Sequence, residues 1–199
     1  MLAAACANPA ADKPKAQVGA AVAAAQPRPE GSEALVISNE NSRVEFVGSK
    51  VTGSHNGSFN RFSGTLYFVP NNLEKSQVTV DIETESVETD DPRLTGHLKS
   101  GDFFEAAKYP KATFVSTEIS PGGANGATHT VTGNLELHGV KKAITFPARV
   151  EVAADSVKLN SEFAINRKDF GILYPGKPDD LIRDEVVIKL TINAPRSRS

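Results

Sequence analysis

The sequence predicts an all-β protein: an eight-stranded antiparallel barrel with a short helical insert, preceded by a disordered tail. Three observations predict this fold. Beyond residue 34, apolar and polar residues alternate with a period of two in segment after segment, which is typical of half-buried strands. The connecting segments are mostly short and rich in Gly, Pro, Asn and Ser, which indicates turns. The alternation stops only around 96–117, so we expect the strands to surround a helical insert there.

The strand pattern occurs in eight segments. Such a set can close into an up-and-down barrel, which removes the free sheet edges and leaves room for side chains or one slim ligand. Composition leaves open whether the interior is packed or hollow. The expected strands are 43–47, 58–69, 76–84, 111–118, 128–138, 143–152, 157–165 and 186–192.

Two short helices are expected in the insert. Asp91 followed by Pro92 predicts a helix start, because Asp caps the first turn and Pro is tolerated at the first helical position. Asp102 with Glu105 resembles a capping box and predicts a second start near residue 103. Pro110 cannot extend that helix. The large apolar residues of this hairpin are Leu94, Leu98, Phe103 and Phe104, which predict a lid or one wall of a barrel entrance.

Composition narrows the class of protein. The chain has 199 residues with 39% hydrophobic and 23% charged, enough for one globular domain with a substantial core. The net charge is −2 and the basic residues are interspersed with acidic ones, so nucleic acid is not expected as a partner. No apolar run is long enough to span a bilayer as a helix.

The N-terminal part, residues 1–33, differs from the barrel domain expected at 34–199. Cys6 is the only cysteine and follows Leu2 and three alanines, which resembles the end of a bacterial lipoprotein signal and predicts acylation at Cys6. Only five residues precede it, fewer than a signal peptide needs, so an Ala-rich leader is the alternative. Residues 7–33 are rich in Ala and Pro and lack aromatic residues, which predicts a disordered tether.

Catalysis is not expected. The chain has four His and one Cys with no metal-ligand spacing, so we expect no metal and no cofactor. A nucleophile elbow, a phosphate-binding loop and a dinucleotide-binding glycine pattern are all missing from the sequence.

Three blocks of sequence carry a resemblance to a known family. HLKSGDFFEAAKYPKATFVST, VTGNLELHGVKK and FAINRKDFGI resemble the YceI-like family across about residues 38–194. The resemblance implies a lipocalin-like barrel, commonly exported, that holds a polyisoprenoid or another long apolar molecule. The chain departs from the family pattern at Lys50, which stands about where the family's opening strand often carries a His. An anionic head group would suit Lys50.

The candidate ligand-binding residues fall into two groups. The apolar group is expected to line the cavity or its lid and comprises Leu98, Phe103, Phe104, Phe114, Phe146 and Phe163. The polar group is expected near the ligand's head group and comprises Lys50, His97, Arg167 and Tyr174. For Arg167 the alternative is structural: it lies next to an Asp and a Gly turn, and an ion pair there would hold the end of its strand.

The function implied by the resemblance is non-catalytic binding of a long isoprenoid or lipid, as carrier or store, in the bacterial cell envelope. That location means the periplasm or the outer membrane, with membrane attachment only through Cys6. The alternative is a surface or periplasmic interaction protein whose barrel is filled and serves as a scaffold. A cavity lined by Phe and Val separates the two hypotheses, because a filled barrel has none.

Overall fold

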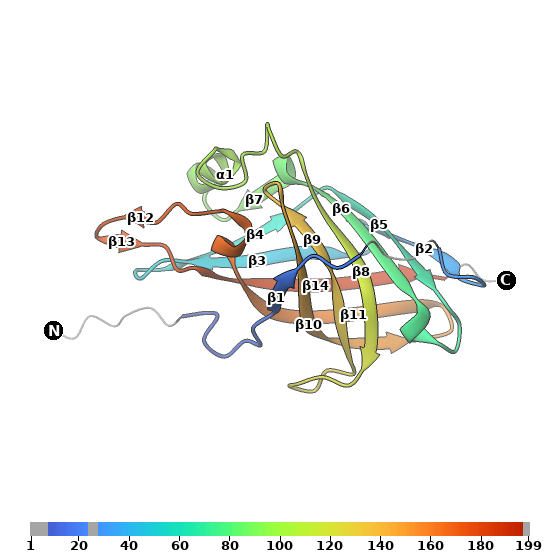
Figure 1. Ribbon diagram of the computed structural model, residues 1–199. Helices are drawn as coiled ribbons and strands as arrows, with labels where there is room; N and C mark the ends of the chain where they lie inside the picture. Colours follow the sequence, from blue (N-terminus) through green and yellow to red (C-terminus); the bar gives the residue numbers. More distant parts are fainter. Residues whose placement is uncertain (1–7, 24–27, 197–199) are drawn as a thin grey trace.

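The computed structural model describes residues 8–23 and 28–196 and shows a curled antiparallel sheet (Figure 1). A 12-stranded sheet follows the order β2-β5-β6-β8-β9-β10-β11-β14-β3-β4-β7, with β1 beside β10. A two-stranded hairpin is separate from it. The strands are β1 (Gln17–Ala20), β2 (Glu33–Ser38), β3 (Arg43–Ser49), β4 (Ser54–Phe59), β5 (Phe62–Phe68), β6 (Gln77–Glu83), β7 (Val87–Thr89), β8 (Lys111–Pro121), β9 (His129–Leu137), β10 (Val140–Val152), β11 (Ser156–Asn166), β12 (Gly176–Lys177), β13 (Asp180–Leu181) and β14 (Glu185–Pro195).

The predicted all-β barrel is confirmed, although three of its strands are bent. β2 continues into β3, β4 into β5 and β6 into β7, and the two halves of each strand pair with the corresponding halves of its neighbour. When each bent strand is counted once, together with β8, β9, β10, β11 and β14, the described part of the wall has eight strands. β14 pairs with β3, which joins the last strand of the wall to the first.

The first halves of two bent strands, β2 and β4, were missed from the sequence. The expected strands leave 48–57 as a connection, but β4 begins at Ser54. Its pattern is weak because one of its inward positions is Gly57, where the ring of Phe46 occupies the space that a side chain would need. The ideal Cβ of Gly57 would lie 2.2 Å from Phe46 Cζ. The glycine therefore completes a cross-strand pair rather than a turn.

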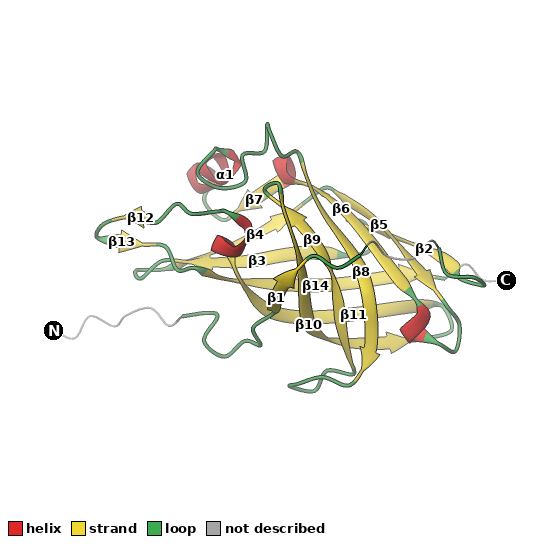
Figure 2. Cartoon of the chain, in the orientation of Figure 1, coloured by secondary structure: helices red, strands yellow, loops and turns green. Residues whose placement is uncertain are grey.

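The helical insert contains one α-helix, α1 (Pro92–Lys99), shown in red in Figure 2. The predicted start is confirmed, since the Asp91 side chain accepts a hydrogen bond from the Arg93 amide. Three short 3-10 helices lie elsewhere: Leu73–Lys75, Thr84–Ser86 and Arg167–Phe170. In the described part of the chain, no helix is both long and apolar enough to cross a membrane.

The expected second helix near Phe103 is wrong. The amides of Phe104, Glu105 and Ala106 donate to the carbonyls of Leu98, Ser100 and Lys99 at 2.9–3.0 Å. These bonds satisfy carbonyls at the end of α1, so the chain folds back on the helix instead of starting a new one. Glu105 has a φ of 45°, outside the right-handed helical region. Asp102 does not cap a helix but pairs with His97.

The expected disorder of residues 7–33 is also corrected where the structure describes them. Residues 8–22, which we call the N-terminal strap, run along the outside of the barrel (Figure 1). Ala10 is completely buried against Val47, Ala164 and Val187. β1 pairs with β10 over four residues. Cys6 and residues 24–27 lie outside the described residues.

The strap is ordered because the barrel has a seam for it. The ladder between β10 and β11 ends at the pair Arg149 and Asn160, two residues from Pro147, which has no amide to extend it. The strap enters this gap: Ala16 donates to the Ala164 carbonyl at 2.9 Å, and Ala164 donates to the Pro14 carbonyl at 2.8 Å. Backbone hydrogen bonds of this kind need no large apolar side chains, so composition did not reveal them.

We predict that replacing Ala10 by Asp releases the strap, because a carboxylate would be buried among apolar side chains without a partner. The free energy of unfolding should fall by about 1–3 kcal/mol. Hydrogen exchange of residues 142–145 should become faster as β1 detaches. The matched control is Ala11→Asp at the exposed neighbouring position. Equal effects of the two substitutions would contradict the docking of Ala10.

Candidate functional site

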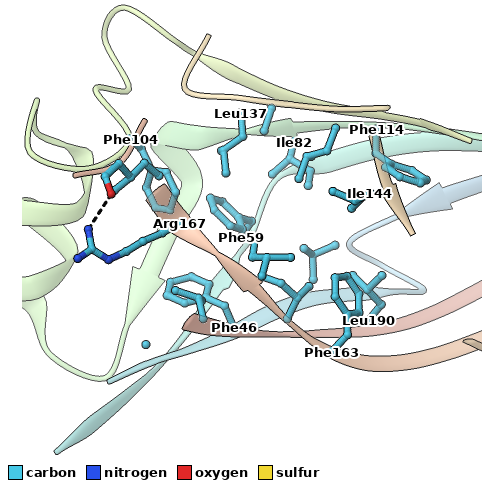
Figure 3. A pocket seen from close by; sticks show the side chains of 18 of the residues that line it. Phe46, Phe59, Ile82, Phe104, Phe114, Leu137, Ile144, Phe163, Arg167 and Leu190 are labelled. Carbon is cyan, nitrogen blue, oxygen red and sulfur yellow. Dashed lines mark hydrogen bonds between the residues drawn. The ribbon is translucent and has the colours of Figure 1, made fainter. Parts of the chain in front are cut away.

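The barrel encloses an apolar cavity of about 510 Å³ (Figure 3). Its wall is built from the inward-facing Val, Leu, Ile and Phe side chains of the long strands. This volume is within the range of about 300–1,000 Å³ that is typical of small-molecule sites. The barrel is therefore hollow, which answers the question that composition left open.

One end of the cavity is apolar and the other is polar. The apolar end is closed by a buried cluster that contains Leu35, Ile37, Leu66, Phe68 and Val157. Every charged or histidine residue that lines the cavity belongs to the opposite end, beside α1 and the β12–β13 hairpin, which we call the mouth. These residues are Lys50, His55, Asp91, His97, Arg167, Lys177, Asp180 and Arg183.

Aromatic rings surround the mouth. The ring of Phe59 lies 5.7 Å from that of Phe46 and 5.5 Å from that of Phe104, between centroids. The ring of Phe103 contacts Tyr174 at 5.5 Å, edge to face. Leu98, on α1, is buried in the same cluster. The reversal of the chain after α1 thus brings the predicted lid residues onto the ends of β3 and β4.

Three further phenylalanines line the deeper part of the cavity. The rings of Phe146 and Phe163 are stacked, with centroids 4.4 Å apart and an angle of 10° between their planes. Phe114 lies 5.9 Å from Phe146. Ala16 and Val18 of the strap pack against the cluster that contains Phe146 and Phe163. The strap is therefore part of the support of the cavity wall at this point.

Every ligand-binding residue predicted from the sequence in the barrel domain borders this one cavity. Their contact with a ligand stays a prediction. The prediction omitted Phe46 and Phe59, which lie between the predicted lid and the barrel interior. The sequence could have indicated both residues, because alternate residues of a strand face the same side of the sheet. Phe46 is two residues from Val44, and Phe59 is two residues from the inward Gly57.

The predicted head-group residues already have partners within the protein. Lys50 forms an ion pair with Asp180 from the β12–β13 hairpin. A hydrogen bond from Lys50 lowers the pKa of the Asp180 carboxyl below its ordinary value, and a hydrogen bond from Thr52 lowers it further. His97 Nε2 lies 2.8 Å from Asp102 Oδ2. These pairs fix the geometry of the mouth and leave fewer free charges than the sequence suggested.

Arg167 has the structural contacts that the sequence offered as an alternative. Its guanidinium donates to the carbonyls of Ile172 at 2.7 Å and Arg183 at 3.2 Å, and to Asp184 at 3.3 Å. The dashed line in Figure 3 marks a hydrogen bond of this guanidinium. Burial lowers the pKa of Arg167, whereas the charge of Asp184 raises it. The side chain thus holds both ends of the loop at 171–184.

The polar residues of the described chain do not meet the requirements of a metal site. Within residues 8–23 and 28–196, no three His, Cys, Asp or Glu side chains are grouped as a metal ion would require. The arrangement instead offers an extended apolar surface with a ring of polar groups at one end. Such a surface can bind an apolar chain by removing it from water.

The fold and the cavity place the chain among antiparallel barrels of the lipocalin-like class. A family model for the YceI-like domain matches residues 35–194. The chain therefore belongs to the YceI-like family.

Relatives and solved structures agree with this assignment. A UPF0312 protein of Pseudomonas aeruginosa is 38% identical over 122 residues, covering 58% of this chain and 62% of the relative. This chain therefore aligns with less than two thirds of that relative. The crystal structure of Burkholderia cenocepacia BcnA has a TM-score of 0.70 and 27% identity, covering 79% of this chain and 99% of the other.

A second solved structure shows the same fold at lower identity. It is described as a polyisoprenoid binding domain from Saccharophagus degradans, with a TM-score of 0.64 and 18% identity. The match covers 83% of this chain and 100% of that domain. At this identity the likeness supports the fold alone.

We predict that Arg167→Met destabilises the mouth, because it removes a buried cation and leaves two carbonyls and the Oδ1 atom of Asp184 without the donor that Arg167 supplies. The free energy of unfolding in urea should fall by about 2–4 kcal/mol. Lys168→Met is the matched control, since Lys168 pairs with the same Asp184 from a side chain that is 45% exposed. The control should cost at most about 1 kcal/mol. A loss as large for Lys168→Met would show that Asp184 alone explains the effect.

Proposed function

We propose that this protein binds a long apolar molecule, such as a polyisoprenoid or a fatty-acyl lipid, and carries or stores it without chemical change. The observation that supports this proposal is the apolar cavity with its polar groups confined to one end. A ligand with an apolar chain and a small polar end has the same polarity pattern. Its chain would lie against Phe114, Phe146 and Phe163, and its polar end would remain at the mouth.

The physical basis of affinity is the transfer of apolar area from water. Each Å² of apolar surface that the ligand buries contributes roughly 25 cal/mol. A chain of several isoprene units buries enough area to offset the entropy lost on binding, even with few polar contacts. The polar pairs at the mouth, such as Lys50 with Asp180, are arranged as structural contacts rather than as a nucleophile with a base.

The location is part of the proposal. We propose that the protein acts in the bacterial cell envelope and that Cys6 is its lipid attachment site. The support is the small-residue sequence before Cys6. Because the strap is fastened to the barrel at Ala10, an anchor at Cys6 would hold the barrel close to a bilayer rather than at the end of a long tether.

The proposal is tested by native mass spectrometry of the full chain, purified from its own host under mild conditions, followed by organic extraction and lipid analysis. A stoichiometric apolar molecule is expected, and its chemistry would define the head group. If the protein is purified without a ligand and takes up neither prenyl nor fatty-acyl probes, the proposal is wrong. The alternative, a scaffold whose loops bind another protein, would then be favoured.

We predict that Leu190→Trp blocks the cavity, because Leu190 lines it and an indole there would fill space that the ligand needs (Figure 3). The affinity for a fluorescent prenyl probe should fall about tenfold or more, which corresponds to a loss of at least ~1.4 kcal/mol of binding free energy. Thr191→Trp adds the same ring at the adjacent, exposed position and should leave the affinity unchanged. Unchanged probe binding in both variants would place the ligand outside the barrel.

A further inference from the structure

The rim of the mouth carries exposed apolar side chains. Six large hydrophobic residues of the described chain are exposed, and three of them, Val51, Leu173 and Leu181, lie beside the mouth. Val51 donates its amide to the Leu181 carbonyl at 3.2 Å, so these two residues are neighbours on adjacent segments. The two residues are 43% and 49% exposed. Leu173 precedes Tyr174, which lines the cavity, and is 63% exposed.

The segments that carry these residues are also cavity walls. Lys50 lines the cavity and directly precedes the exposed Val51. Gly176 lines the cavity and pairs with the exposed Leu181 across the hairpin. The hairpin that bears Leu181 projects from the barrel at the α1 end (Figure 1). The exposed residues are therefore continuous with the opening through which a ligand would pass.

The strap holds the N-terminal part of the chain against the barrel at Ala10. Ala10 packs on Val47, which is three residues from Lys50 on the rim, a distance of roughly 10 Å along a strand. Cys6 lies four positions before Ala10, and four positions of chain span at most about 14 Å. Residues 1–7, MLAAACA, contain no charged side chain. An attachment at Cys6, as proposed above, would therefore hold the mouth near the bilayer.

We propose that the mouth is a docking face for a lipid bilayer, in which Val51, Leu173 and Leu181 enter the interface. An apolar ligand could then pass between cavity and bilayer without crossing water. The proposal rests on the proposed function for its purpose, since a docking face at the mouth serves exchange only if the cavity carries a ligand. Its physical basis is that apolar side chains of interfacial segments are buried in the headgroup and acyl boundary.

The composition of the chain permits a sharp test. It contains no Trp, so one introduced Trp is a unique fluorescent reporter, and Cys6 is its only thiol. The full chain is coupled through Cys6 to a maleimide phospholipid in phosphatidylcholine vesicles, which supplies a high effective concentration at the surface. Reporters are placed singly at the rim, as Val51→Trp and Leu181→Trp. Matched reporters replace exposed valines of the opposite half, as Val36→Trp and Val152→Trp.

The expected result is that brominated acyl chains remove about half or more of the rim emission, because interfacial side chains reach about 5–10 Å into the boundary region. The rim emission should also shift to shorter wavelength, and the emission of the opposite half should not change. Equal quenching at both ends, or none at either, would overturn the proposal.

A second measurement separates docking from ligand binding. The variant Val51→Ser with Leu181→Ser should slow the transfer of a bound fluorescent prenyl probe to vesicles about tenfold, while its affinity for the probe in vesicle-free solution is unchanged. The matched double variant Val36→Ser with Val152→Ser should transfer at the original rate. Equal transfer rates would contradict the docking face. Failure of the unmodified chain to bind any probe in solution would instead contradict the proposed function, whatever the quenching shows.

Discussion

The structure depends on how the barrel wall is completed between β10 and β11. These strands pair only at one end, because Pro147 cannot supply an amide where the ladder would continue. Behind the gap lie Phe146 and Phe163, whose stacked rings are part of the cavity wall. The strap supplies the missing backbone partners through β1 and Ala16. The strap, which composition predicted to be part of a disordered tether, is therefore part of the barrel wall.

The fold could be predicted from the sequence where local pattern and environment agree. Alternation identified the long strands, and Asp91 with Pro92 identified the start of α1. The predictions failed where a distant contact decides the local structure. β4 was missed because Gly57 is complementary to Phe46 on another strand. The second helix was wrong because the end of α1 uses the amides that it would have needed. The strap was missed because its partners are backbone groups of the seam.

For the candidate site too, prediction from the sequence succeeded for local properties and failed for distant contacts. The cavity residues could be chosen from the sequence because inward parity and aromatic character are local properties, and Phe114, Phe146 and Phe163 all line the cavity. The state of the charged residues could not be predicted. Lys50 and Asp180 are 130 positions apart. Arg167 finds its carboxylate at Asp184, 17 positions away, rather than at the neighbouring Asp169 that the sequence suggested. Pairing of charges is a property of the closed fold.

These features together indicate how selectivity would arise in such a site. The apolar end is sealed by the cluster around Ile37 and Phe68, so the length of the cavity limits the length of chain that fits. Lys50 and Arg167 at the mouth are already in ion pairs, with Asp180 and Asp184, so a polar head group would have to compete with a carboxylate such as Asp180 for Lys50. When a head group replaces a carboxylate as the partner of a lysine, the gain in binding free energy is smaller than when it pairs with a free charge. The reason is that the existing ion pair already offsets the desolvation of the lysine. Shape and apolar area, rather than head-group charge, should therefore dominate the choice of ligand.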